Sequence, residues 1–212
     1  SIKALLSLLL TITLVGCSKP QQQASSTTQP TTVTITDHAD RTVTVPTNPS
    51  KVAILGILPL PSMLTIYLDS PKSIVAMEPA SMNAAKNGVL SQLYPDIVNV
   101  NTDIMDGEDV NIESLIALEP DIVFYNANDT QDLEKLENAG LTAVAVSPTK
   151  WNYDCIKTYD EWMQLLNKIY PDHASSREEL VQKYATQKYT EIQDKVKGIL
   201  DVQKVLFLFQ YD

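Results

Sequence analysis

The sequence predicts an α/β protein: a first lobe with a parallel sheet flanked by helices, a long interlobe spine helix, and the start of a second α/β lobe. Three observations support this fold class. Apolar runs typical of buried strands alternate with helical segments between residues 52 and 146. Apolar residues then recur at helical spacing over 151–170. Beyond a second helical pattern, the apolar run Val205–Phe209 predicts a further strand.

The first half of this pattern gives six expected elements. Period-two alternation over Thr32–Pro46, on both sides of a polar turn at 37–40, predicts a β-hairpin. Apolar runs predict strands, and longer amphipathic segments between them predict helices. In chain order we expect strand Val52–Leu55, helix Ser62–Leu68, strand Ser73–Met77, helix Ala80–Leu93 and a short strand Val98–Asn101.

The next segment continues the alternation with clear boundary residues. Asn111 is a suitable N-cap, Thr130 is a second, and Gly140 is a typical helix C-cap. Pro120 and Pro148 end the segments before them. The expected elements are helix Ile112–Leu118, strand Asp121–Tyr125, helix Gln131–Asn138 and strand Leu141–Val146. Right-handed crossovers would place all the strand C-terminal ends at one edge of the sheet.

The last part predicts two helices and a strand. The spine helix is expected at 151–170 and ends before Pro171. Ser176 and Glu179 form a capping-box pattern for a second helix that reaches about residue 197. Val205–Phe209 has no downstream strand to pair with, so we expect 171–212 to begin a second lobe whose remainder is missing. The alternative is a final strand inserted into the first sheet.

The N-terminus predicts a signal peptide over residues 1–16. Lys3 precedes an apolar run that is too short to span a bilayer but suits a secretory leader. The run ends in Leu14-Val15-Gly16-Cys17, which resembles the lipobox of bacterial lipoproteins. That resemblance implies cleavage before Cys17, lipidation of its thiol, and a membrane-anchored protein of the cell envelope, in the periplasm or on the outer side of the cytoplasmic membrane. Residues 17–31 would be the lipidated cysteine and a flexible tether. The alternative is an uncleaved helix with a chance cysteine.

Composition excludes several classes of function. The 212 residues are 44% hydrophobic and 20% charged, as in ordinary globular proteins, with a formal net charge of −10. Without a basic run, no nucleic-acid partner is expected. Two cysteines cannot form a disulfide framework, and two scattered histidines, His38 and His173, argue against a resident metal ion or bound Zn or Mn. The six glycines form no GxGxxG, P-loop or Gly-x-Ser-x-Gly motif, so we do not expect an enzyme.

Two stretches of the chain resemble a known family. The hairpin TVTITDHADRTVTVPTNPSKVAIL and the segment from Asn111-Ile112-Glu113-Ser114-Leu115 to Leu118-Glu119-Pro120-Asp121-Ile122-Val123 are similar to periplasmic binding proteins of iron-siderophore, haem and cobalamin ABC transporters. The segment from Gly140 to Pro148 is similar as well, and the likeness covers 32–212. It implies two lobes, the first at 32–150, with the ligand between them.

The same resemblance implies a function. The protein would capture an iron complex, haem or a corrinoid and deliver it to a membrane permease, as a monomer when complete, without covalent chemistry or a cofactor. Alternatives are a binding protein for another small solute or metal ion, and a tethered sensor without a transporter. Arg41 and Arg177 lie away from the predicted strand ends, so this lobe suits a neutral, cationic or aromatic ligand better than a trianionic siderophore.

Candidate ligand contacts follow from the strand ends, because ligands of open parallel sheets bind beyond the C-terminal ends of the strands. These candidates are Leu58, Pro59, Leu60, Glu78, Tyr125, Asn126, Ser147 and Trp151. Each has a plainer alternative: the loop at 56–61 as a simple connector, Glu78 as a solvated acid, and Trp151 as a residue that fastens the spine helix to the lobe. Cys155 is expected to be a small buried residue. The acidic run Asp103–Asp109 is expected to be a loop without calcium, because it lacks the EF-hand spacing.

Overall fold

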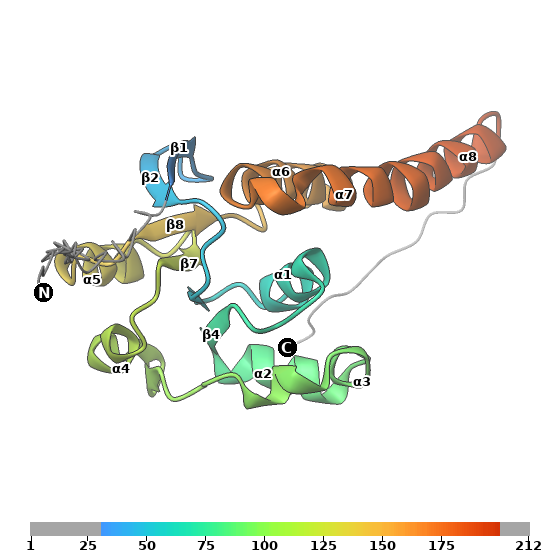
Figure 1. Ribbon diagram of the computed structural model, residues 1–212. Coiled ribbons are helices and arrows are strands. Elements are labelled where there is room, and N and C mark those ends of the chain that lie inside the picture. The colour runs from blue at the N-terminus through green and yellow to red at the C-terminus, as the bar shows by residue number, and fades with distance from the viewer. Residues whose placement is uncertain (1–30, 200–212) are drawn as a thin grey trace, which may run out of the picture.

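A computed structural model describes residues 31–199. Its centre is a four-stranded parallel sheet in the order β4-β3-β7-β8 (Figure 1). The strands are β3 (Val52–Ile54), β4 (Ile74–Met77), β7 (Ile122–Asn126) and β8 (Ala143–Val146). The predicted α/β class and parallel sheet are therefore confirmed. The expectations for the signal peptide, Cys17, the tether up to residue 30 and the strand Val205–Phe209 lie outside the described residues.

Helices cover both faces of this sheet, which explains why its strands are continuously apolar. Along β7, Ile122 and Phe124 enter one hydrophobic cluster, whereas Val123 and Tyr125 enter the other. The first cluster includes α1 (Leu60–Leu68) and α6 (Cys155–Ile169); the second includes α4 (Ile112–Ala117) and α5 (Thr130–Asn138). The alternation follows from the two-residue period of a strand.

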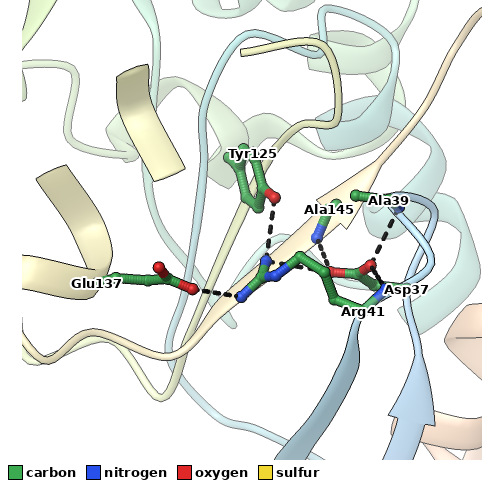
Figure 2. Close-up of polar contacts among 6 residues, drawn as sticks. All are labelled: Asp37, Ala39, Arg41, Tyr125, Glu137 and Ala145. Carbon is green, nitrogen blue, oxygen red and sulfur yellow. Dashed lines mark hydrogen bonds and ion pairs between the residues drawn. The ribbon is translucent and has the colours of Figure 1, made fainter. Parts of the chain in front are cut away.

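The predicted N-terminal hairpin is confirmed as β1 (Thr32–Thr36) paired with β2 (Thr42–Pro46). Its turn docks on the end strand of the sheet: the His38 N–H donates to the Ala145 carbonyl at 3.1 Å, and the Ala145 N–H donates to Asp37 Oδ2 at 3.1 Å. Arg41 follows the turn, and Figure 2 shows its guanidinium between Asp37, Tyr125 and Glu137. The hairpin is thus fastened to the sheet by polar contacts at one turn.

Two expectations between the second and third sheet strands were wrong. The single helix Ala80–Leu93 is divided into α2 (Pro79–Asn87) and α3 (Leu90–Leu93), because Gly88 is extended and ends α2. The segment expected as strand Val98–Asn101 begins inside the 3₁₀ helix η1 (Pro95–Asn99), and Asn101 makes one isolated bridge to Ala76. Pro95 at the first helical position favours the helix over the strand.

The helix caps were partly as expected. Asn111 caps α4, and its side chain accepts from the Ser114 N–H at 3.0 Å. The N-cap of α5 is Asp129 rather than Thr130, because the Asp129 carboxylate accepts from the N–H groups of Gln131 and Asp132. The acidic run before α4 forms two short paired strands, β5 (Met105–Asp106) and β6 (Asp109–Val110).

The helix expected over 151–170 begins later, and one of its faces packs against the sheet. It is α6, which starts at Cys155 because Asn152 and Tyr153 have positive φ and Asp154 caps it. Its apolar face, including Trp162 and Ile169, is buried in the first cluster. Cys155 is exposed, so the expectation of a buried thiol was wrong; it occupies the first turn, outside that apolar face.

The helices after Pro171 first pack against α6 and α1 and then extend away from the lobe, and Asn167 Nδ2 of α6 donates to Glu178 Oε1 at 2.9 Å. They are α7 (Pro171–Val181), a π-helical turn η2 (Gln182–Thr186) and α8 (Gln187–Val196), and no residue of α7 or α8 is fully buried. Figure 1 shows this run extending away from the sheet. The capping box at Ser176 was wrong because Pro171 starts α7, and the Ser176 hydroxyl donates to the His173 carbonyl instead. Within residues 31–199, none of the helices combines the length and hydrophobicity needed to cross a bilayer.

Candidate functional site

The C-terminal ends of the parallel strands meet at one edge, and four of the eight sequence-predicted site residues are exposed or partly exposed along it: Leu58, Pro59, Glu78 and Asn126. β3 is the central neighbour: Ile54 pairs with Met77 of β4 and with Phe124 of β7. Asn126 at the end of β7 and Glu78 just beyond β4 therefore lie on either side of the chain that leaves β3. Such an edge is where open α/β sheets bind ligands.

Gly56 is the point at which three strand ends are joined. Its N–H donates to Glu78 Oε1 at 2.6 Å, and its carbonyl accepts from Asn126 Nδ2 at 3.0 Å. Gly56 has a φ of +64°, a conformation that side chains disfavour, and an added Cβ would lie 3.3 Å from the Asn126 Cβ. The edge is therefore organised around a glycine that sits between an acid and an amide.

Glu78 occupies an electrostatically unfavourable position. Burial raises the pKa of its carboxyl above the ordinary value, the Gly56 N–H opposes this shift, and the acids Asp132 and Asp129 raise it further. The charged form of Glu78 is thus less favourable in the folded chain than in the unfolded chain. Its contribution to the free energy of unfolding decreases as the pH rises from 4.5 through its folded pKa.

Asn126 extends the edge toward the end strand of the sheet. Its Oδ1 accepts from the Asn128 N–H at 3.1 Å, and the Asn128 side chain donates to Thr149 Oγ1 at 3.1 Å. A polar hollow beside them is lined by Asn126, Asn128 and the first residues of α5. Asp129 lines the same hollow, so its surface is acidic and amide-rich.

The loop that follows Gly56 gives the edge an apolar part. Leu58 is 52% exposed, and Pro59 is exposed beside it. Leu60, by contrast, is only 1% exposed and belongs to the first hydrophobic cluster as the start of α1. Of the three loop residues predicted as contacts, Leu58 and Pro59 are the ones that solvent or a ligand can reach.

Two further predicted contacts have internal partners. Tyr125 is 1% exposed, and its hydroxyl accepts from Arg41 Nη1 at 3.0 Å (Figure 2). Ser147 is 2% exposed; its Oγ accepts from the Lys150 N–H at 3.0 Å, and its carbonyl accepts from Trp162 Nε1 at 2.8 Å. In this arrangement both side chains support the loops rather than face the edge.

Trp151 lies at the junction of the hairpin and α6. Its ring meets the His38 ring edge-on, with 4.9 Å between the centroids, and it packs against the first hydrophobic cluster. His38 in turn accepts from the Ser147 N–H through Nδ1 at 3.1 Å. Trp151 thus packs between the hairpin and the first hydrophobic cluster, and its contact with a ligand stays a prediction.

His38 predicts a dependence of stability on pH. Burial, assisted by Lys150, lowers the pKa of His38 below its usual 6.5, although Glu161 and Asp37 act in the opposite direction. The unfolded chain therefore binds this proton more readily, and the stabilisation by neutral His38 is lost as the pH falls below 6.5 through the folded pKa.

Urea unfolding at pH 7.5 and 5.5 should show a smaller pH-dependent loss of stability in His38→Gln than in the parent protein. His173→Gln is the matched control and should keep the parent's dependence; equal pH responses in all three proteins would contradict the assignment.

The sequence alone did not single out Gly56, Asn128 or Thr149. A glycine directly after a buried strand is a known signal for a positive φ, so Gly56 could have been found. Asn128 and Thr149 meet only because β7 and β8 are neighbours with a definite register. No group of three or more His, Cys, Asp or Glu side chains within the described part of the chain is arranged to hold a metal ion.

A parallel sheet with helices on both faces and an open, polar carboxyl edge makes this part of the chain an α/β lobe. The chain belongs to the family described as periplasmic binding protein, whose model matches residues 67–212. Its relatives are substrate-binding proteins. This family includes those of ABC importers, as the sequence resemblance implied.

Curated relatives and solved structures agree with this family. The molybdate-binding protein MolA of Haemophilus influenzae is 33% identical over 117 residues, which is 53% of this chain and 31% of MolA. The uncharacterized ABC transporter substrate-binding lipoprotein YvrC of Bacillus subtilis is 26% identical over 148 residues, which is 66% of this chain and 43% of YvrC. The chain therefore spans less than half the length of these curated relatives.

The solved structures share the fold. A periplasmic solute binding protein from Veillonella parvula aligns with a TM-score of 0.67 and 24% identity, covering 78% of this chain and 48% of its own. MolA with bound molybdate aligns with a TM-score of 0.63 and 24% identity, covering 79% of this chain and 54% of its own.

Proposed function

We propose that this chain is the N-terminal, ligand-contacting part of an ABC importer's substrate-binding lipoprotein. It would capture an iron complex, haem or a corrinoid between two lobes and pass it unchanged to the permease. The observation that carries the proposal is the sheet edge, where the exposed apolar Leu58 and Pro59 lie beside Glu78 and Asn126. No residue is assigned a catalytic role.

The charge of this edge supports a neutral, cationic or flat aromatic ligand. The groups whose charges act on Glu78 are Asp129 and Asp132, which are themselves acidic. Arg41, a fork-shaped donor suited to anions, already contacts Asp37, Tyr125 and Glu137 away from the edge. An apolar surface beside a hydrogen-bonding rim suits a large organic complex better than a small anion.

A second candidate ligand is an oxyanion. It is favoured by the 33% identity to MolA over 117 residues, because MolA is a molybdate-binding protein. The acidic edge disfavours it, because anion sites in proteins are built from N–H groups and cationic side chains. Cations contributed by a second lobe would be required to reverse this balance.

The proposal includes the anchor and the partner. Cys17 would carry the lipid and the polar segment 18–31 would tether the lobe above the membrane, as YvrC's description as a lipoprotein supports. The second lobe would begin in 171–212, after the interlobe helix expected at 151–170 and observed as α6. The complete protein would be a monomer that binds one ligand and interacts with a permease.

Calorimetric titration of the complete protein tests the ligand class. Haemin, cyanocobalamin, a ferric hydroxamate siderophore and sodium molybdate are the probes. We expect one of the three organic probes to bind once per chain and remain chemically unchanged, and molybdate to bind far more weakly. If molybdate binds most tightly, the ligand is an oxyanion. Conversion of a bound probe at a catalytic rate would show that the protein is an enzyme.

A matched pair of variants tests whether the ligand meets this edge. Leu58 and Ile66 are 52% and 53% exposed, but Leu58 follows β3 whereas Ile66 lies on α1. Leu58→Ser should weaken binding of the active probe by roughly tenfold or more, because burying a leucine contributes about 1.5–3 kcal/mol. Ile66→Ser should bind like the parent protein. Equal affinities in the two variants would place the ligand elsewhere.

A further inference from the structure

Glu78 and Asn126 hold the same glycine from two sides. Glu78 accepts the Gly56 N–H and Asn126 donates to the Gly56 carbonyl, so both backbone polar groups of this residue are bound by side chains of neighbouring strand ends. Peptide groups at a strand end without ladder partners otherwise exchange their hydrogen bonds with water. Such a double contact restricts the rotation of Gly56, which is the residue type with the most conformational freedom to lose.

The two side chains come from the ends of strands that pair with β3. Asn126 is the last residue of β7, and its Oδ1 accepts from the Asn128 N–H. Glu78 is the residue that precedes α2, one position after Met77 of β4. The β3 strand is paired with both β4 and β7, so the three ends keep their relative positions. The contacts to Gly56 therefore connect a flexible residue to two rigid supports.

We infer that Glu78 and Asn126 are positioning residues that set the conformation of the Gly56–Pro59 loop before a ligand arrives. In this role Glu78 acts on the loop as a hydrogen-bond acceptor, and Asn126 acts as a donor. The consequence is that Leu58 is presented at the sheet edge in one orientation, which lowers the ordering cost of binding. The inference rests on the proposed function only in taking this edge as the one that faces the ligand.

The unfavourable electrostatics of Glu78 support a positioning role over a stabilising one. Burial and two neighbouring acids oppose its charge, so the carboxylate is not placed there for global stability. Gln at this position would keep an oxygen that accepts the Gly56 N–H while removing the charge. Glu78→Gln should therefore preserve the loop, whereas Glu78→Ala removes the acceptor.

Hydrogen exchange of the Gly56 amide in the complete protein without ligand tests the inference. Loss of a charge-assisted hydrogen bond predicts about tenfold or more faster exchange in Glu78→Ala. Glu78→Gln should stay within about threefold of the parent protein, because an amide oxygen replaces the acceptor. The Val123 amide, which donates to the Thr142 carbonyl in the neighbouring strand pair, should exchange at the parent rate in all variants.

Asn126→Asp is the second variant and does not depend on whether Glu78→Ala folds. Aspartate keeps the size and the acceptor for the Asn128 N–H but cannot donate to the Gly56 carbonyl, so the Gly56 amide should exchange faster. Parent-like exchange in Asn126→Asp, or equally fast exchange in Glu78→Gln and Glu78→Ala, would overturn the positioning role. Because no ligand is present, these outcomes are separate from a failure of the titration that tests the proposed function.

Discussion

Replacement of Asp37 by alanine is expected to lower the free energy of unfolding by about 1.5–3 kcal/mol, because it removes a fully buried carboxylate whose hydrogen bonds are charge-assisted. The Asp37 side chain is fully buried and accepts four hydrogen bonds, from the N–H groups of Ala39, Arg41 and Ala145 and from Arg41 Nη1. Alanine would leave the buried Ala145 N–H without an acceptor. The hairpin would lose one of its hydrogen bonds to β8, while the His38 N–H would still donate to the Ala145 carbonyl.

Glu137→Ala is the matched control for this prediction. Glu137 contacts the same arginine, with 2.8 Å between its Oε1 and Arg41 Nη2, but its side chain is 56% exposed. Exposed ion pairs contribute about 1 kcal/mol or less. Urea unfolding of the parent protein and both variants would measure the difference. A loss for Asp37→Ala no larger than that for Glu137→Ala would show that the buried carboxylate does not hold the hairpin.

Replacement of Cys17 by alanine is expected to move the protein from the membrane fraction to the soluble fraction. The motif Leu14-Val15-Gly16-Cys17 predicts a lipidated cysteine, and two or three acyl chains anchor a protein stably where one chain does not. The variant should also lose incorporation of labelled palmitate. Fractionation of cells that express the gene with its own leader would measure both effects.

The other cysteine provides the control for the anchor. Cys155 is exposed at the start of α6 and follows Asp154 rather than a lipobox. Cys155→Ala should remain membrane-bound and labelled. Unchanged membrane retention of the Cys17→Ala protein would show that Cys17 is not the membrane anchor.

The elements best predicted from sequence were those whose boundaries rest on local chemistry. The strand expected at Asp121–Tyr125 is observed at Ile122–Asn126, one residue later. It was predictable because a buried parallel strand is apolar on both faces. Gly88 is an equally local signal, but the prediction followed the longer helical pattern over Ala80–Leu93 and continued the helix through it. Helix starts were less predictable where two cap residues adjoin, as Asp129 and Thr130 do.

The candidate site was predictable as an edge but not as a set of contacts. The predicted strand ends placed Glu78 and Asn126 at the carboxyl edge of the sheet, without showing which strands are neighbours. The direction of each side chain depends on the pleat and on helix starts, which is why Leu60 and Tyr125 are buried whereas Leu58 is exposed. The contacts of Gly56 depend on β3 lying between β4 and β7, and that order is not encoded locally.

The most direct test of the central claim is to identify what the complete protein carries when it is purified from the cell envelope under native conditions. Native mass spectrometry with metal analysis would give the mass, the stoichiometry and any bound iron or cobalt. We expect one iron complex, haem or corrinoid per chain, released unchanged on denaturation and lost or weakened in Leu58→Ser. A bound oxyanion, or recovery of a chemically altered product, would contradict it.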